Sequence, residues 1–153
     1  VLILGRYLKC SEEKIVEALC ISELVGIMIT ARKDRLSALC GAFTAAMGAG
    51  CGIVWLMGGA LKEMNLVIRT MVGDLSGIVC DGAKPSCALK MSTGLYSAFV
   101  SAELACHDKV VDATDGLSER DVDCSISNLG RLGHDGMNET DDIVLDIMTH
   151  KRN

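Results

Sequence analysis

The sequence predicts an all-α fold, a bundle of small-residue-rich buried helices around a turn that contains cysteines. Half of the 153 residues are apolar but only 3% are aromatic, so the core must consist of aliphatic side chains, Met, Ala and Gly. Apolar residues recur every three or four positions along most of the chain, which is the spacing of one helical face. The length suits one domain with one core, so we expect residues 1–153 to form a single helical domain.

The charge and the first residues of the chain exclude some classes of protein. The net charge is −5 and there is no run of Lys or Arg, which argues against a nucleic-acid partner because such a surface needs clustered positive charge. The chain begins at Val1 without a basic segment or a small-residue cleavage site, so nothing in it resembles a secretory signal. We therefore expect a cytoplasmic protein and, because no methionine begins it, a fragment of a longer one.

The first helical pattern begins at Ser11. This residue is a favourable N-cap, and two glutamates follow it in the first turn, where the helix dipole favours negative charge. The apolar residues that come next lie on one helical face: Val16, Cys20, Leu24 and Met28. The predicted helix ends near Arg32.

An uncharged stretch of 26 residues, from Leu36 to Leu61, is long enough for a transmembrane helix. It is rich in Gly, Ala, Ser, Thr and Cys rather than in Leu, Ile and Phe, and its flanks lack an aromatic belt, so we favour a soluble core and no membrane span. Gly48 and Gly52, four residues apart, would allow two helices to approach closely. The expected structure is a central helical hairpin, broken near these glycines or near residues 58–59.

Two helices and a turn are predicted after this stretch. Residues 62–79 carry apolar side chains at helical spacing, and residues 91–107 are again apolar and small, which indicates a second buried helix. Between them lies CDGAKPSC, residues 80–87. This octapeptide contains the only proline of the chain and predicts a tight non-helical turn.

The C-terminal third is acidic and should face water. Residues 108–146 contain eleven Asp or Glu but only three Lys or Arg. Ser118 and Asp121 suggest a capping box at the start of one helix. Thr140 is expected to cap a last helix that ends in basic residues up to Arg152, as the helix dipole favours.

Eight cysteines in a chain without secretory features are more typical of thiols or metal ligands than of disulfides. Cys80 and Cys87 flank the predicted turn, where both thiols could bind one metal centre and Lys84 could supply a compensating positive charge. The spacing alone leaves a second interpretation open, in which the two are core cysteines beside a turn. Five other cysteines occur singly and are expected to fill the core as small hydrophobic residues: Cys10, Cys20, Cys51, Cys106 and Cys124.

Four segments carry a family resemblance: RLSALCG (35–41), CGIVWLMGG (51–59), IVCDGAKPSCALK (78–90) and GMNETDDIVLDIMTHK (136–151). Together they resemble the L-cysteine desulfidases, which are similar to the alpha subunit of iron-dependent L-serine dehydratases. The resemblance implies that Cys40, Cys80 and Cys87 bind a [4Fe-4S] cluster and that the chain is the C-terminal, cluster-binding part of a longer lyase. Three cysteines for four irons leave one iron open to act as a Lewis acid.

The resemblance also implies a reaction. A base removes the α-proton of L-cysteine, sulfide departs, and the enamine hydrolyses to pyruvate and ammonia, whereas the dehydratase relatives expel water from L-serine. The family's base resembles a cysteine in a GCTEP-type segment that this chain lacks, so we assign no base here and expect the chain to be inactive alone. Its partners are then a small amino acid and either a missing N-terminal part or a second copy. A non-catalytic, truncated helical protein is the alternative from another class.

Seven further polar residues could contact a substrate or support the cluster, although each also has a structural interpretation: Asp81, Lys84, Ser92, Thr93, His107, His134 and His150. The first two lie in the turn and could assist the cluster as its neighbours. Ser92 and Thr93 could bind a carboxylate or cap a helix. His107 and His150 are expected at helix ends, and His134 lies in a Gly-rich connection from which it could approach a substrate.

Overall fold

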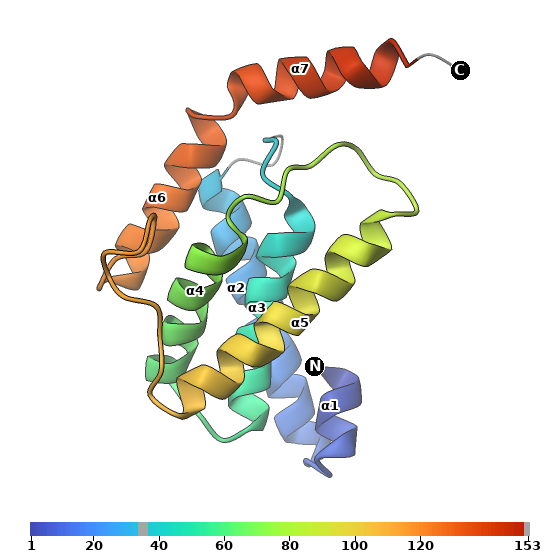
Figure 1. Cartoon of the computed structure of the whole chain (residues 1–153). Coiled ribbons are helices and arrows are strands. Elements are labelled where there is room, and N and C mark those ends of the chain that lie inside the picture. The colour runs from blue at the N-terminus through green and yellow to red at the C-terminus, as the bar shows by residue number, and fades with distance from the viewer. Residues whose placement is uncertain (34–36, 152–153) are drawn as a thin grey trace.

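The structure, a computed structural model, describes residues 1–33 and 37–151. Within these residues the chain forms seven α-helices and no strand, which confirms the predicted all-α fold. The helices are α1 (Leu2–Tyr7), α2 (Glu12–Lys33), α3 (Gly41–Leu56), α4 (Leu61–Leu75), α5 (Cys87–Cys106), α6 (Val122–His134) and α7 (Asn138–Thr149). Figure 1 shows α2 to α5 gathered into a bundle, with α6 along one side and α7 across one end.

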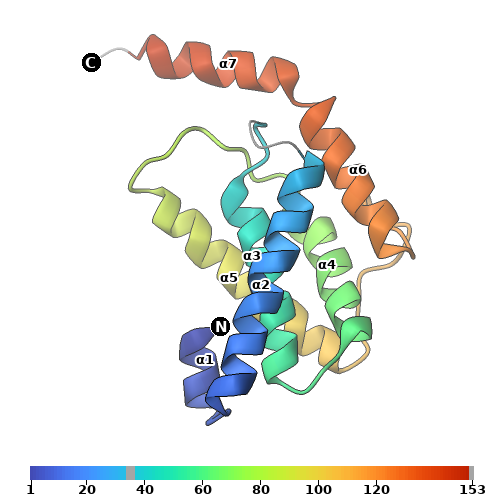
Figure 2. The same ribbon diagram turned by 180° about the vertical axis from the view of Figure 1, so that it is seen from behind.

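Helix α3 is the centre of this bundle and packs against α2, α4 and α5 (Figures 1 and 2). Most of its residues are buried and small. A Cβ atom added to Gly48 would lie 2.2 Å from the carbonyl oxygen of Ser22 in α2, and one added to Gly52 would lie 2.7 Å from that of Ala18. The two glycines therefore allow the close helix approach that their spacing predicts.

Of the two predicted breaks in the uncharged stretch, the one near Gly48 and Gly52 is wrong, because α3 continues through both glycines as a single helix and ends at Leu56. The break near residues 58–59 is confirmed, since α4 begins at Leu61. The chain turns only at Gly58, whose φ of +91° lies in the left-handed region that glycine adopts readily. Leu36, the first residue of that stretch, lies outside the described residues. None of the helices that the structure describes is long and apolar enough to span a bilayer.

The two N-terminal helices differ in how well the sequence predicts them. The hydroxyl of Ser11 accepts a hydrogen bond of 3.2 Å from the amide of Lys14, which confirms the predicted cap of α2. The pattern does not predict α1, which has only six residues. Helix α1 packs on α2 through Gly5, where an added Cβ atom would lie 2.6 Å from a side-chain carbon of Ile15.

Helix α5 begins four residues earlier than predicted, and only one of its faces is buried. Its first turn forms directly after Pro85, whose carbonyl accepts a hydrogen bond from Ala88, and proline is favoured at a helix start. The buried face consists of small residues: Gly94, Ser97, Ala98, Ser101, Ala102 and Ala105. Large apolar residues face outward: Leu89, Met91, Leu95, Tyr96 and Phe99. The expectation of a fully buried helix is therefore wrong.

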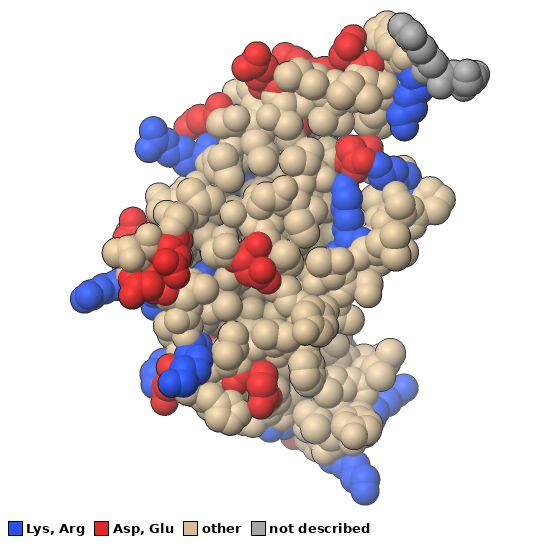
Figure 3. Space-filling model, in the orientation of Figure 1, with Lys and Arg blue, Asp and Glu red and all other residues tan. Residues whose placement is uncertain are grey.

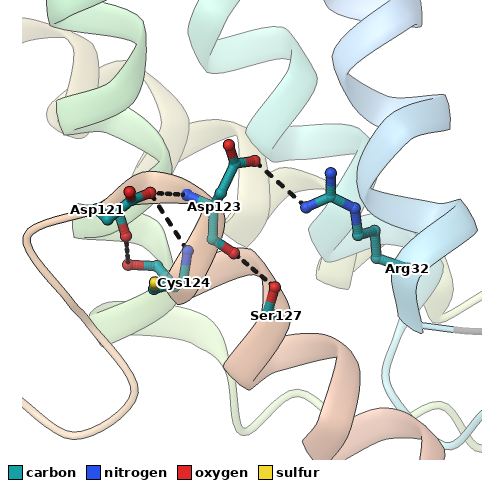
Figure 4. Close-up of polar contacts among 6 residues, drawn as sticks. Arg32, Asp121, Asp123, Cys124 and Ser127 are labelled. Carbon is teal, nitrogen blue, oxygen red and sulfur yellow. Dashed lines mark hydrogen bonds and ion pairs between the residues drawn. The ribbon is translucent and has the colours of Figure 1, made fainter.

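Contacts at the first turn of helix α6 stabilise its start and join it to α2. Its N-cap is Asp121, whose carboxylate accepts hydrogen bonds from the amides of Asp123 and Cys124 (Figure 4). The predicted capping box is wrong because Ser118 is buried three residues before this cap. Figure 4 also shows Asp123 paired with Arg32 at 3.3 Å, a contact that joins the start of α6 to the end of α2.

Helix α7 crosses one end of the bundle and has no buried residue. It begins at Asn138, so the predicted cap Thr140 lies inside the helix rather than before it. The acidic side of α7 faces water as predicted, but apolar residues such as Ile143 and Ile147 are exposed as well. Arg152, where the sequence pattern ends this helix, lies outside the described residues.

Candidate cysteine site

Two of the three predicted cluster ligands are brought together by a β-bridge. Leu39 pairs with Val79 in an antiparallel bridge, flanked by a hydrogen bond of 3.0 Å from the amide of Cys40 to Ile78 and one of 2.5 Å from the amide of Cys80 to Ala38. Because successive residues of extended chain alternate between faces, Cys40 and Cys80 fall on the same side of the bridge. The bridge also explains why α4 ends at Leu75, before its predicted limit.

The third predicted ligand, Cys87, is the first residue of α5. Its thiol lies 3.5 Å from the carbonyl oxygen of Gly82, which closes the turn between the two cysteines. Gly82 has a φ of +87°, a conformation that strains any residue with a Cβ atom. The CDGAKPSC segment is therefore the non-helical turn that the sequence predicts.

The charged residues of this turn are joined around Asp81. One of its carboxylate oxygens pairs with Lys84, and the other accepts a hydrogen bond of 2.5 Å from Lys90. The amino group of Lys90 also donates to the carbonyl oxygen of Val79 at 2.7 Å. Two lysines against one aspartate leave the turn with net positive charge beside Cys80 and Cys87. The sequence indicates Lys84 as the source of positive charge beside the cysteines. It does not indicate Lys90, whose side chain extends from the first turn of α5 to Val79 and Asp81.

A second lysine that sequence reasoning missed lies at the bridge. Lys33, in the last turn of α2, is only 3% exposed, and its amino group donates to the carbonyl oxygen of Leu39 at 2.9 Å. It thus places a positive group against the residue that precedes Cys40. Lysine side chains are rarely buried this deeply, so the sequence alone does not indicate the burial of Lys33.

The segment 136–151, which carries part of the family resemblance, lies over the cysteine turn. Helix α7 passes above the loop between α4 and α5 in both views (Figures 1 and 2). A Cβ atom added to Gly82 would lie 2.6 Å from the terminal carbon of Met148. Two of the segments that carry the resemblance are therefore neighbours in the fold, although residues 91–135 separate them in sequence.

The three cysteines do not form a ready metal site in this structure. Within residues 1–33 and 37–151, no group of three or more His, Cys, Asp or Glu side chains is arranged to hold a metal ion. The donor set nevertheless has the chemistry of an iron–sulfur site, with three thiols and neighbouring lysines. The assignment of Cys40, Cys80 and Cys87 as ligands stays a prediction.

The five other cysteines were expected to fill the core, and they differ in how deeply they are buried. Cys51 is fully buried, and burial raises the pKa of its thiol to about 12. Cys10 and Cys106 are half-buried, and burial is also the main cause that raises the pKa of Cys106. Cys20 and Cys124 are exposed, so the prediction is wrong for them. Both occupy outward positions on helices that face water.

Two of the histidines lie at helix ends as the sequence predicts, whereas His134 lies in the last turn of α6 and not in the predicted Gly-rich connection. His107 and His150 follow the last residues of α5 and α7, and each ring contacts a backbone carbonyl of the preceding turn. His134 ends α6 and is exposed beside Asp135. Thr93 bonds to the carbonyl of Leu89 inside α5, so the capping interpretation of Ser92 and Thr93 is wrong.

This fold and these segments place the chain in a family. The chain matches the serine dehydratase alpha chain family over residues 1–146, and it belongs to that family. The match covers every helix up to the middle of α7.

The curated relatives are UPF0597 proteins of bacteria. The chain is 52% identical over 141 residues to one from Bacteroides fragilis, 51% identical over 142 residues to one from Phocaeicola vulgatus, and 46% identical over 148 residues to one from Oleidesulfovibrio alaskensis. These alignments cover 92%, 93% and 97% of this chain but only 33% to 35% of the relatives, so the chain spans about a third of their length. No solved structure matches the chain.

Proposed function

We propose that this chain is the cluster-binding part of an iron–sulfur-dependent lyase that eliminates sulfide from L-cysteine and yields pyruvate and ammonia. The observation that carries the proposal is the bridge between Leu39 and Val79. It ties the segment of Cys40 to the segment of Cys80 in a chain that belongs to the serine dehydratase alpha chain family.

Cys40, Cys80 and Cys87 would hold the cluster, which supplies an iron without a protein thiolate as a Lewis acid toward the substrate. The chain itself contributes positive charge around these thiols. Lys84 and Lys90 together outweigh the carboxylate that they share. Such charges offset the negative charge of thiolates and of an anionic substrate.

The base that removes the α-proton is not assigned to this chain. His134 is the one histidine that the sequence places near a substrate, but its ring is exposed at the end of α6 and faces Asp135. We propose that the remainder of a longer protein supplies the base, because the relatives extend over about three times the matched length. The 153-residue chain alone should then bind a cluster without turning over L-cysteine.

Anaerobic reconstitution with iron and sulfide tests the ligand set. The chain should acquire the broad visible absorption of a [4Fe-4S] cluster and lose it in air. Cys40→Ala, Cys80→Ala and Cys87→Ala should each abolish or strongly weaken that absorption, because two thiolates hold a cluster poorly. Cys124→Ala, an exposed cysteine on α6, is the matched control and should keep it. Equal cluster content in all four variants would refute the assignment.

A second candidate substrate is L-serine, which the description of the family favours. Loss of water from serine needs the same proton removal and the same stabilisation of a leaving group. A longer protein that contains this chain should be given each amino acid in turn, with pyruvate measured for both and sulfide for cysteine. Faster pyruvate formation from L-serine would replace L-cysteine in the proposal and leave the cluster assignment unchanged.

A further inference from the structure

A groove lies between α4 and α5, away from the three cysteines of the proposed cluster site. The groove has a volume of about 350 Å³, which is within the range of small-molecule sites and far larger than one water molecule or a bare ion needs. Its residues come from both helices: Thr70, Asp74 and Leu75 from α4, and Tyr96, Ser97 and Val100 from α5 among others. None of these residues is part of the cysteine site proposed above.

One side of the groove carries a carboxylate next to hydroxyl groups. The hydroxyl of Ser97 donates to the carboxylate of Asp74 at 2.5 Å. Thr70 lies one helical turn before Asp74 on the same face of α4. Asp74 is exposed in the groove and forms no ion pair with any residue that the structure describes, so its negative charge has only Ser97 beside it.

Thr70 gives an independent indication of a ligand. It is only 6% exposed and lines the groove, and its hydroxyl oxygen finds no hydrogen-bond partner within the described part of the chain. A buried hydroxyl without a partner loses the hydrogen bonds that it makes to water, so such groups are rare unless something else satisfies them. A ligand that donates hydrogen bonds would satisfy both Thr70 and Asp74.

The chemistry of the walls selects the kind of ligand. Asp74 favours a cation, while Leu75, Val100 and Leu104 provide an apolar surface next to it. None of the described residues that line the groove is a lysine or arginine, so a carboxylate on the ligand would find no positively charged partner and would be repelled by Asp74. An amine with a hydrocarbon body therefore suits the groove better than a zwitterionic amino acid or a bare metal ion.

We propose that the groove between α4 and α5 binds a small molecule with a primary ammonium group and a short hydrocarbon body. The ammonium group donates to the carboxylate of Asp74 and to the hydroxyl of Thr70, and the hydrocarbon body lies along the apolar wall. This site is separate from the cysteines, and its test does not depend on a cluster.

NMR titration of the 153-residue chain with n-butylammonium chloride is the primary experiment. The amide signals of α4 and α5 around the groove should shift on saturation. Neutral n-butanol and L-alanine should cause much smaller shifts, since the first lacks the charge and the second brings a carboxylate. Potassium chloride at the same concentration should not displace the amine. Displacement by potassium would make this an inorganic cation site and overturn the proposal.

Three variants sharpen the test. Asp74→Asn keeps the shape and a hydrogen-bond acceptor for Ser97, and it should weaken butylammonium binding at least about tenfold, as expected when a charged hydrogen-bond partner is lost. Thr70→Val removes only the unpartnered hydroxyl and should weaken binding severalfold. Asp142→Asn, on an exposed position of α7, is the control for net charge and should bind as the original chain does. Unchanged binding in Asp74→Asn, with the fold intact by circular dichroism, would overturn the proposal.

Discussion

Helices α3 and α5 have similar small-residue compositions but very different surroundings. Helix α3 is enclosed by α2, α4 and α5, and its residues Gly48 and Gly52 lie against backbone atoms of α2. Helix α5 packs only its small residues against α3 and α4 and turns its large apolar residues outward. In both helices, small residues mark the sites of close helix contact. The large apolar residues of α5 are therefore not the ones that hold it in the bundle.

The surface of the molecule reflects the outward position of the large apolar residues of α5. Charged side chains are sparse on the face that carries α5 (Figure 3), and several large apolar residues of α5 are exposed there. Exposed large apolar residues also occur on α7, α1 and α2, whereas α3 is covered by its neighbours.

The largest effect should come from the enclosed helix. Gly48→Ala places a methyl group 2.2 Å from a backbone oxygen of α2, and because backbone cannot move aside cheaply, we expect the free energy of unfolding to fall by about 3 kcal/mol. Gly41→Ala, at the first position of α3, is the matched control because nothing lies within 4 Å of its added Cβ atom. It should raise stability by roughly 0.5 kcal/mol. Urea denaturation of both variants measures the contrast, and equal stabilities would show that α2 and α3 are loosely packed.

The second effect tests the inner face of α5. Ala98→Leu adds three carbon atoms at a fully buried position near Gly50 of α3, so we expect a loss of about 2 kcal/mol from overpacking. Ala88→Leu makes the same change at an exposed position of the same helix, and it should alter stability by less than about 0.5 kcal/mol. If both variants lost stability alike, α5 would not be divided into an inner and an outer face.

The division of α5 shows where sequence patterns succeed and where they stop. Periodicity and composition predict that residues 91–107 are helical, and they predict the cap of α2 and the cysteine turn. They do not reveal which face of α5 is buried, because the pattern of small and large residues is the reverse of the usual amphipathic one. The sequence rule that large apolar residues point inward fails when glycine, alanine and serine make the contacts.

The candidate site, too, is predicted only in part by the sequence. Motif resemblance selects Cys40, Cys80 and Cys87, but no local pattern predicts the bridge between Leu39 and Val79, since the sequence predicts helical structure for both segments that it joins. Lys33 and the groove around Asp74 depend on the packing of separate helices. These features arise from tertiary contacts, which the local helix and strand propensities of the sequence do not predict.

The third prediction concerns the outer face of α5. Leu89 and Phe99 are both exposed, and contiguous exposed apolar surface promotes association. We expect the 153-residue chain to self-associate as its concentration rises. A double variant, Leu89→Ser with Phe99→Ser, should reduce this while changing the free energy of unfolding by less than about 1 kcal/mol. Sedimentation equilibrium measures the effect, and a monomeric original chain at high concentration would contradict it.

The smallest effect is expected from the ion pair at the far end of α5. Lys62, in the first turn of α4, pairs with Asp108, which follows α5 and has a φ of +55°. The hydrogen bond between them lowers the pKa of the Asp108 carboxyl and raises the pKa of the Lys62 amino group. Because both groups are exposed, solvent and salt screen the pair, so it should stabilise the fold only slightly.

The sign of the pH dependence follows from these directions. A carboxyl with a lowered pKa stabilises the folded chain above its ordinary value of 3.8 and loses that contribution as the pH falls through the folded value. A lysine with a raised pKa stabilises the chain below its ordinary value of 10.5 and loses that contribution as the pH rises through the folded value. Asp108→Asn, which tolerates the left-handed backbone, should therefore differ from the original chain only between these limits and match it in strong acid. Thermal unfolding at several pH values, with and without added salt, measures the difference. A large loss of stability in Asp108→Asn would mean that this end of α5, rather than its face of small residues, holds the helix against the bundle.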